Sequence, residues 1–272
     1  MTPPRILCYH KVDRRVELGV TRLSPRRFAR QLERLARRGC TTLSLDQLRA
    51  CLTGARPCGP REIAITFDDG YRALREHAFP VLAAHGFSAI CFVVTDYAGR
   101  LNRWDVAYGG RRFAHLAWRD MRRWQSRGIE FASHTASHPR LTWLADDDAA
   151  RELARSRAAI RDALDVDPAV VSWPFGAHGE REHHIAEREG YTLGLTIGGA
   201  RRWGGDLFAV PRHPVYMWSP ATPGFGALAG LDVLAGTVAN RCAVGTSIIQ
   251  RRRPTIRVDE QVGLAATLMM KG

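Results

Sequence analysis

Two short segments of the sequence carry the residue types of a hydrolytic metal site. The first, Thr-Phe-Asp-Asp-Gly, places the carboxylates of Asp68 and Asp69 side by side. The second, His-Thr-Ala-Ser-His, places the imidazoles of His134 and His138 four residues apart. A catalytic metal needs a few protein ligands and an open position for water. A second carboxylate that is free of the metal can then accept the proton of that water.

Neither segment is specific by itself. Two aspartates and a glycine after a strand most often form a turn, and two histidines four residues apart occur on many helices. Each segment, however, follows a largely apolar run, at 63–65 and at 129–132, that predicts a strand. The chemistry of α/β folds lies at the carboxyl ends of their strands, so we expect both segments on one face of the fold.

Strands and helices alternate along the chain that must position these segments. Apolar and β-branched runs predict strands at 6–9, 63–67, 88–94, 129–133, 170–173 and 192–197. Helical spacing of apolar residues predicts helices at 25–39, 43–52, 71–85, 117–127, 146–164 and 181–189. The connections are long enough for parallel strands with right-handed crossovers. The sequence therefore predicts an α/β fold of about seven strands, which favours a barrel over an open sheet.

The alternation of strands and helices ends near residue 218. The remainder is rich in glycine and alanine, so we expect a domain at 1–218 and an extension of unassigned fold at 219–272. Residues 96–112 contain several glycines and predict a loop that lines the active face. Trp104 in this loop is a candidate for stacking on a sugar, with ordinary core packing as the alternative.

The chain has a formal net charge of +13, and only two of its 40 basic residues, Lys11 and Lys271, are lysines. A genomic preference for arginine codons accounts for that choice. The charge itself would attract an anionic polymer, a nucleotide-sugar or an acidic membrane surface. The basic residues are spread along the predicted helices, without zinc-finger spacing or interleaved aromatic residues. We therefore expect no nucleic-acid partner.

The six cysteines include no Cys-x-x-Cys pair. A chain of this length folds without disulfides, so we expect reduced thiols. The first residues lack the pattern of a signal peptide, and glycines and prolines interrupt the longest uncharged stretch. The sequence predicts a cytoplasmic protein, with peripheral contact at the inner membrane face as a further option.

The ordered motifs resemble the polysaccharide deacetylases, the NodB-homology domain of carbohydrate esterase family 4. The resemblance covers about residues 5–217 and includes the opening Ile-Leu-Cys-Tyr-His, both segments above and a third motif, Trp-Pro-Phe-Gly. It implies that 1–218 is a NodB-like catalytic domain with a distorted (β/α) barrel. The implied reaction is metal-dependent removal of an N- or O-acyl group from a sugar.

The resemblance also implies roles for single residues. Asp69, His134 and His138 become the metal ligands, and Asp68 becomes the general base. The main-chain amide of Phe175 in the third motif becomes a donor to the oxyanion. Zinc suits a site of two histidines and one aspartate, and such sites also take nickel, cobalt or iron.

The third motif departs from the family, in which an arginine ahead of the proline pairs with the catalytic aspartate. Ser172 and Trp173 occupy those places here. Arg212 is a candidate replacement, and we also count Arg212 and Trp173 among the candidate substrate contacts. The sequence leaves open whether Arg212 has either role.

The general acid of the family is not obvious in this chain. His213 is the best candidate for protonating the leaving amine, and a loop histidine without a catalytic role is the alternative. His10 ends the first predicted strand, so we expect it to face the same pocket as a substrate contact, or else to be structural. If His213 is not the acid, His10 and His178 are the next candidates.

The predicted function is metal-dependent removal of an N-acetyl group from a sugar, an oligosaccharide or a glycoconjugate. The substrate would be nucleotide-linked, lipid-linked or glycosidic. One alternative is hydrolysis of a non-sugar amide or a formyl group on the same fold. Another is a non-catalytic carbohydrate-binding protein, against which the intact set of Asp68, Asp69, His134 and His138 argues.

Overall fold

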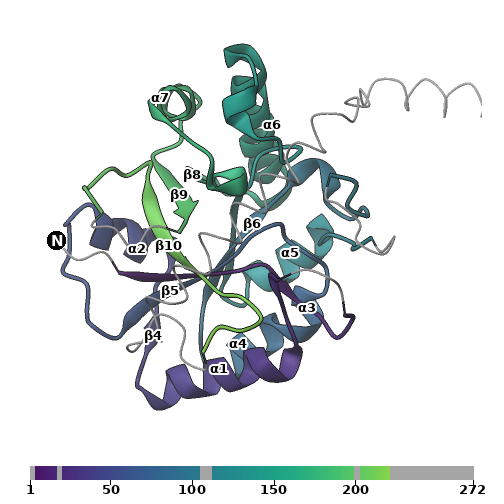
Figure 1. Ribbon diagram of the computed structural model, residues 1–272, viewed down its shortest axis with the longest axis vertical. Coiled ribbons are helices and arrows are strands. Elements are labelled where there is room, and N and C mark those ends of the chain that lie inside the picture. The colour runs from purple at the N-terminus through teal and green to yellow at the C-terminus, as the bar shows by residue number, and fades with distance from the viewer. Residues whose placement is uncertain (1–3, 17–19, 105–111, 199–202, 221–272) are drawn as a thin grey trace, which may run out of the picture.

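Seven parallel strands close into a barrel within the residues that the computed structural model describes, 4–16, 20–104, 112–198 and 203–220 (Figure 1). In spatial order they are β1 (Arg5–Tyr9), β10 (Val210–Pro214), β9 (Leu193–Ile197), β8 (Val170–Ser172), β7 (Ile129–Ser133), β6 (Ala89–Val93) and β5 (Glu62–Phe67). The barrel closes because β5 also pairs with β1, from Arg5 opposite Ile63 to Tyr9 opposite Phe67. The prediction of a barrel of about seven parallel strands is confirmed.

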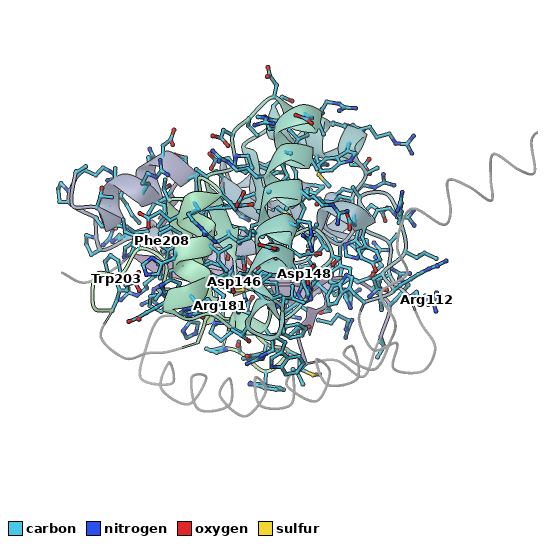
Figure 2. The ribbon with its side chains drawn as sticks, turned by 90° about the horizontal axis from the view of Figure 1, so that it is seen from above. Arg112, Asp146, Asp148, Arg181, Trp203 and Phe208 are labelled. Carbon is cyan, nitrogen blue, oxygen red and sulfur yellow. The ribbon has the colours of Figure 1, made fainter. Side chains whose placement is uncertain are left out.

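Helices surround this barrel. They are α1 (Pro25–Arg37), α2 (Leu45–Leu52), α3 (Leu74–His77), α4 (Phe79–Ala84), α5 (Trp118–Gln125), α6 (Asp146–Leu164) and α7 (Glu180–Arg188). Short additions are β4 (Thr41–Thr42) on β5, the pair β2 (Lys11–Val12) and β3 (Arg22–Leu23), and the 3₁₀ turns η1 (Thr95–Tyr97), η3 (Leu141–Trp143) and η4 (Pro174–Gly176). Figure 2 shows α6 and α7 side by side, where Arg181 Nε donates to Asp146 Oδ1 at 2.7 Å.

Two of the predicted elements differ from the structure for reasons of proline chemistry. The predicted helix 71–85 is two short helices that meet at Ala78, because Pro80 lacks an N–H and its ring crowds the preceding turn. Strand β10 was not among the predicted strands, because Pro211 and Pro214 within it suggest a loop.

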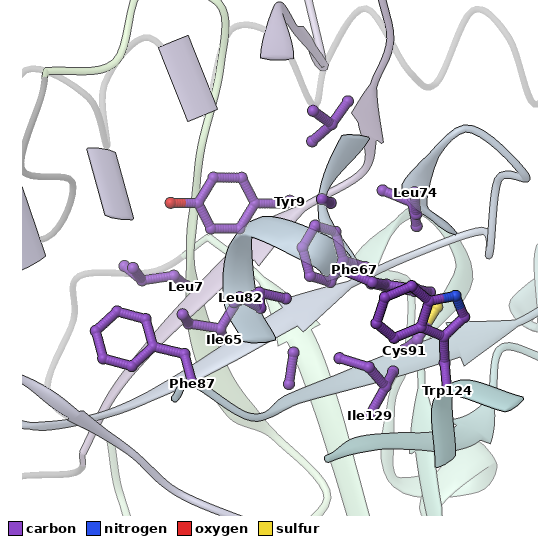
Figure 3. Packing of buried hydrophobic residues seen from close by; sticks show 14 of the residues in the cluster. Leu7, Tyr9, Ile65, Phe67, Leu74, Leu82, Phe87, Cys91, Trp124 and Ile129 are labelled. Carbon is purple, nitrogen blue, oxygen red and sulfur yellow. The ribbon is translucent and has the colours of Figure 1, made fainter. Parts of the chain in front are cut away.

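The buried residues form separate layers outside and inside the barrel. Leu7, Phe67 and Ile129 belong to the outer layer, where they pack with residues of α1, α4 and α5 (Figure 3). Ile6 and Ala64, which alternate with the outer residues along the same strands, belong to a cluster inside the barrel. Further along these strands the inside positions are Cys8 and Thr66, followed by His10 and Asp68, so reactive side chains gather at the carboxyl end of the barrel.

The domain boundary near 218 and the extension at 219–272 stay predictions, since nearly all of the extension lies outside the described residues. At its start, Arg27 Nη2 donates to the main-chain oxygen of Ser219 at 2.7 Å. In the described part of the chain, no helix combines the length and the apolar character needed to cross a membrane.

Candidate metal centre and catalytic site

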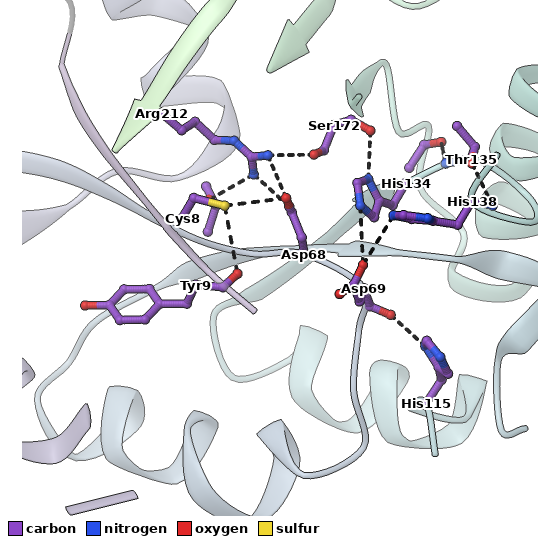
Figure 4. A network of polar contacts seen from close by, with 12 residues as sticks. Cys8, Tyr9, Asp68, Asp69, His115, His134, Thr135, His138, Ser172 and Arg212 are labelled. Atoms are coloured by element: carbon purple, nitrogen blue, oxygen red, sulfur yellow. Dashed lines mark hydrogen bonds and ion pairs between the residues drawn. The ribbon is translucent and has the colours of Figure 1, made fainter. Parts of the chain in front are cut away.

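Asp69, His134 and His138 converge at the carboxyl ends of β5 and β7 (Figure 4). The Oδ1 atom of Asp69 lies 3.5 Å from Nε2 of His134 and 3.6 Å from Nε2 of His138. All three side chains are buried. One carboxylate oxygen and two imidazole nitrogens that point at a common volume form the donor set of a divalent transition metal.

The main chain at this site is held in an unusual conformation. Five non-glycine residues of the described chain have a positive φ, and four of them lie in or beside the site: Asp69 (69°), Thr135 (66°), His138 (64°) and Phe175 (60°). Left-handed backbone is unfavourable for such residues, and it persists where the surrounding structure enforces it. The site is therefore preorganised by its loops.

The orientation of the triad suits a metal. His134 Nδ1 lies 2.7 Å from the main-chain oxygen of Ser172 and must donate to it, so Nε2 is the nitrogen that faces Asp69 and can bind a metal. Burial would lower the pKa of His134, but the charges of Asp68 and Asp69 raise it, so metal binding would release a proton from Nε2. Burial and the neighbouring His134 lower the pKa of His138 to about 3, which keeps this imidazole neutral at pH 7. Burial would raise the pKa of Asp69, but its interactions with His134, His138 and His10 hold it below its usual value, so the carboxylate is ionised. The residues thus fit a divalent metal.

Asp68 is bound by Arg212 rather than by the triad. Arg212 donates from Nη1 to Oδ1 and from Nη2 to Oδ2, both at 2.7 Å (Figure 4). Burial alone would raise the pKa of Asp68, but the charge of Arg212 outweighs burial, and the pKa falls to about 2. Arg212 Nη2 also donates to Ser172 Oγ at 2.7 Å, so the serine in the arginine position of the third motif contacts the replacement arginine.

Arg212 and Trp173 do not fit the substrate contacts predicted for them. Arg212 is 2% exposed, and its guanidinium is occupied by Asp68 and other protein groups, so it positions Asp68. Trp173 is completely buried in the cluster around α6 and α7, and its indole N–H donates to the main-chain oxygen of Phe208 at 2.8 Å. Neither side chain offers a free face to a substrate.

His213 lies on the opposite face of β10 from Arg212, because side chains alternate along a strand. It pairs in register with Leu7, which belongs to the layer outside the barrel. Arg212 points inward to Asp68. The structure therefore does not support the predicted role of His213 as general acid.

His10 follows β1 and lies near the carboxylate of Asp68. A nitrogen of its ring, the thiol of Cys8 and an oxygen of Asp68 all lie within 4.8 Å of one another. Its Nδ1 is buried and has no hydrogen-bond partner among the described residues. Burial lowers the pKa of His10 despite the nearby aspartates. His178, the other alternative acid, is paired with His183 at 2.8 Å.

Phe175 lies beside the triad in the turn η4. Its ring meets the ring of His138 edge to face, with 4.8 Å between the centroids. No hydrogen bond of the Phe175 main-chain N–H is found within the described residues, whereas the N–H of Gly176 donates to Trp173. The main-chain N–H of Phe175 is therefore available as a donor, which an oxyanion site requires.

Several residues of the site were not identified from the sequence. Ser172 contacts both His134 and Arg212, and the thiol of Cys8 donates to Asp68 Oδ2 at 3.4 Å. His115 contacts the main chain of Asp69. Cys8 and Ser172 lie in or beside the matched motifs, but the sequence predicts no contact for either of them. His115 lies in a segment without a motif, so no local pattern identifies it. Trp104 stacks on His138, with 3.8 Å between the ring centroids.

Comparison with known proteins gives consistent results. The sequence model of the family described as polysaccharide deacetylase matches residues 55–194. YxkH of Bacillus subtilis strain 168, named for the same family, is 29% identical over 226 residues, which is 82% of this chain and 74% of YxkH. The poly-β-1,6-N-acetyl-D-glucosamine N-deacetylase of Escherichia coli K12 is 24% identical, and the match covers 65% of this chain but only 31% of that protein.

A solved structure shares the fold. The deacetylase PplD of Streptococcus pyogenes superposes with a TM-score of 0.71 at 22% sequence identity. The superposition covers 81% of this chain and 95% of PplD. The likeness agrees with the barrel described above.

Proposed function

Because the chain belongs to the polysaccharide deacetylase family, we propose that it is a metal-dependent hydrolase that removes an N-acetyl group from a sugar, an oligosaccharide or a glycoconjugate. The observation that carries this proposal is the pairing of two differently tuned carboxylates. Asp69 faces two imidazoles, and Asp68 faces a guanidinium. Amide hydrolysis at a metal centre needs one carboxylate that binds the metal and a second that accepts the proton of water.

Asp69, His134 and His138 would hold the metal, for which we propose zinc, with nickel, cobalt or iron as alternatives. When bound, a divalent cation supplies a Lewis acid for the acyl oxygen and lowers the pKa of water. The hydrogen bond from His134 to Ser172 fixes the imidazole so that Nε2 stays available as a ligand.

The remaining roles belong to the chain's own proton carriers and donors. Asp68, kept ionised by Arg212, accepts the proton of the attacking water. A ring nitrogen of His10 lies within 4.8 Å of a carboxylate oxygen of Asp68, so His10 can take up the proton that Asp68 has accepted from water and deliver it to the leaving amine; we therefore assign the acid role to His10 instead of His213. The N–H of Phe175 donates to the oxygen that becomes negative.

The substrate class follows by analogy with relatives. The name of the Escherichia coli relative specifies a polymer of N-acetylglucosamine, so we propose an N-acetylhexosamine in a glycosidic chain as the substrate. Nucleotide-linked and lipid-linked sugars, and contact with an acidic membrane surface, are further options consistent with the charge of +13.

A panel of substrates tests this proposal. Acetate release is measured from β-1,6-linked N-acetylglucosamine oligosaccharides, a nucleotide-linked N-acetylhexosamine, a non-sugar acetamide and a formamide. We expect release from a sugar substrate, and Asp68→Asn should lower kcat by ~10²-fold or more, the usual scale for a lost general base. Release only from the non-sugar amides would contradict the proposed substrate class.

A further inference from the structure

His115 lies beside the metal triad without being one of its ligands. Its Nδ1 is 2.7 Å from the main-chain oxygen of Asp69 (Figure 4), and the side chain is 2% exposed. A carbonyl oxygen only accepts, so Nδ1 must carry the hydrogen.

The carbonyl that accepts this bond belongs to a residue in strained backbone. Asp69 has a φ of 69°, a conformation that residues other than glycine rarely adopt. Two main-chain bonds hold the same turn against the segment around His115, from Leu116 N to Gly70 O at 2.9 Å and from Arg72 N to Ala114 O at 2.7 Å. His115 adds the bond to Asp69 itself, the residue whose carboxylate must face the two imidazoles.

The ring of His115 is itself fixed by packing. It stacks on Tyr71 with 5.1 Å between centroids and an angle of 26° between the planes. The rings of Tyr97 and Trp104 lie 5.7 and 6.3 Å away, and the whole side chain is enclosed. Because the ring cannot turn, its Nδ1–H points only at the main-chain oxygen of Asp69.

We propose that His115 is a positioning residue of the metal centre, which fixes the peptide of Asp69 so that the Asp69 carboxylate faces His134 and His138. The inference rests on the metal site proposed above and adds a residue outside the sequence motifs. Without the Nδ1–H donor, the peptide of Asp69 can relax from its left-handed conformation, and the carboxylate turns away from the imidazoles. Metal affinity then falls although all three ligands remain present.

Two substitutions at this position separate the hydrogen bond from packing. The amide nitrogen of His115→Asn can replace Nδ1 as a donor, whereas His115→Leu is of similar size and has none. Co²⁺ alone is titrated into metal-free protein, and its affinity is read from the visible absorption of the bound ion. We expect His115→Leu to bind Co²⁺ ~10–100-fold more weakly than wild type, and His115→Asn to regain most of the loss.

The matched control is His85→Phe. His85 packs against Phe87 with 5.8 Å between ring centroids and precedes β6, at the opposite end of the barrel from the triad. The His85→Phe variant should bind Co²⁺ with the affinity of wild type. If His115→Leu does not fold, His115→Phe, which fills the space of the ring, takes its place.

An apolar variant that binds Co²⁺ as tightly as wild type would overturn the proposal. So would His115→Asn that folds and binds as weakly as the apolar variant, because packing alone would then explain the loss. The titration needs no substrate. Absence of deacetylase activity with an intact Co²⁺ result would therefore count against the proposed function and leave the role of His115 standing.

Discussion

Asp68 and Asp69 are neighbours in the sequence but have different partners in the barrel. Asp69 faces His134 and His138, and Asp68 lies in a bidentate pair with Arg212. Such buried pairs are favourable only when both charges are present, because a lone buried charge has no compensation. The state of Asp68 therefore depends on Arg212.

The first prediction concerns Arg212→Gln, which leaves Asp68 buried beside a neutral amide. In wild type the pKa of Asp68 is lowered from 3.8 to about 2, so its ionised form stabilises the fold above its usual pKa, and this stability is lost as the pH falls toward 2. Without Arg212, burial dominates and the pKa of Asp68 rises. We expect an acid limb to appear in the pH profile of kcat/KM at a higher pH than in wild type.

Arg30→Gln is the control for that measurement, because Arg30 lies on the exposed face of α1. Its profile should match wild type. A profile of Arg212→Gln that also matched wild type would show that Arg212 does not keep Asp68 ionised.

The second prediction tests whether His10 or His213 is the general acid. His10→Ala should reduce hydrolysis of an amide much more than hydrolysis of an activated ester, because only the amine needs a proton to leave. His213→Ala, on the outer face of β10, is the matched variant and should reduce both substrates equally or not at all. The reverse pattern, with selective loss of amide hydrolysis in His213→Ala, would return the acid role to His213.

At the scale of elements, the turn after β5 aims both carboxylates. Gly70 in this turn has a φ of +65°, and a Cβ added there would lie 2.8 Å from Cγ1 of Val93. Gly86 has the same φ of +65° but no atom within 4 Å of an added Cβ. The two glycines therefore share the backbone requirement and differ in the space around them.

The third prediction uses this difference. Gly86→Ala should lower the free energy of unfolding by ~1–2 kcal/mol, the usual scale for a left-handed residue. Gly70→Ala should lower it by a further ~1–3 kcal/mol through the contact with Val93. Gly70→Ala should also weaken metal binding, because the proposed ligand Asp69 directly precedes Gly70. Urea unfolding of both variants gives the comparison, and equal losses would show that the Val93 contact is unimportant.

Local signals predicted most elements because their causes are local. The helix 146–164 was predicted with the observed bounds, and the start of the helix predicted at 25 agrees with Ser24, which caps α1 by accepting from Arg27 N. Strand β10 was missed because its prolines are typical of a loop. It forms because β1 and β9 pair with it on either side. Without that strand, the sequence could not show that Arg212 points inward and His213 outward.

The same limit applies to the site. Asp68, Asp69, His134 and His138 were identified because each pair lies within one short motif. Arg212 is 144 residues from Asp68, and the contact exists only because β1 closes the barrel between β5 and β10. Contacts of this kind depend on topology, and no local pattern encodes them.

At the scale of the whole molecule, the proposed metal site joins the ends of β5 and β7, which are not adjacent in the barrel. A ligand that binds the folded state and not the unfolded state stabilises the fold in proportion to its excess over Kd. The fourth prediction is that metal at 100 times Kd raises the free energy of unfolding by about 2.7 kcal/mol. Thermal unfolding with metal and with chelator measures the shift, and the triple alanine variant of Asp69, His134 and His138 should show none.

The central claim is that metal held by Asp69, His134 and His138 is required to deacetylate an N-acetylated sugar. The most direct test is acetate release from an N-acetylglucosamine oligosaccharide by protein as purified, after chelation, and after return of one equivalent of Zn²⁺ per chain. The account predicts release, loss of release and recovery, with no recovery in His138→Ala. Release that persists in fully metal-free protein, or no release at any metal content, would contradict it.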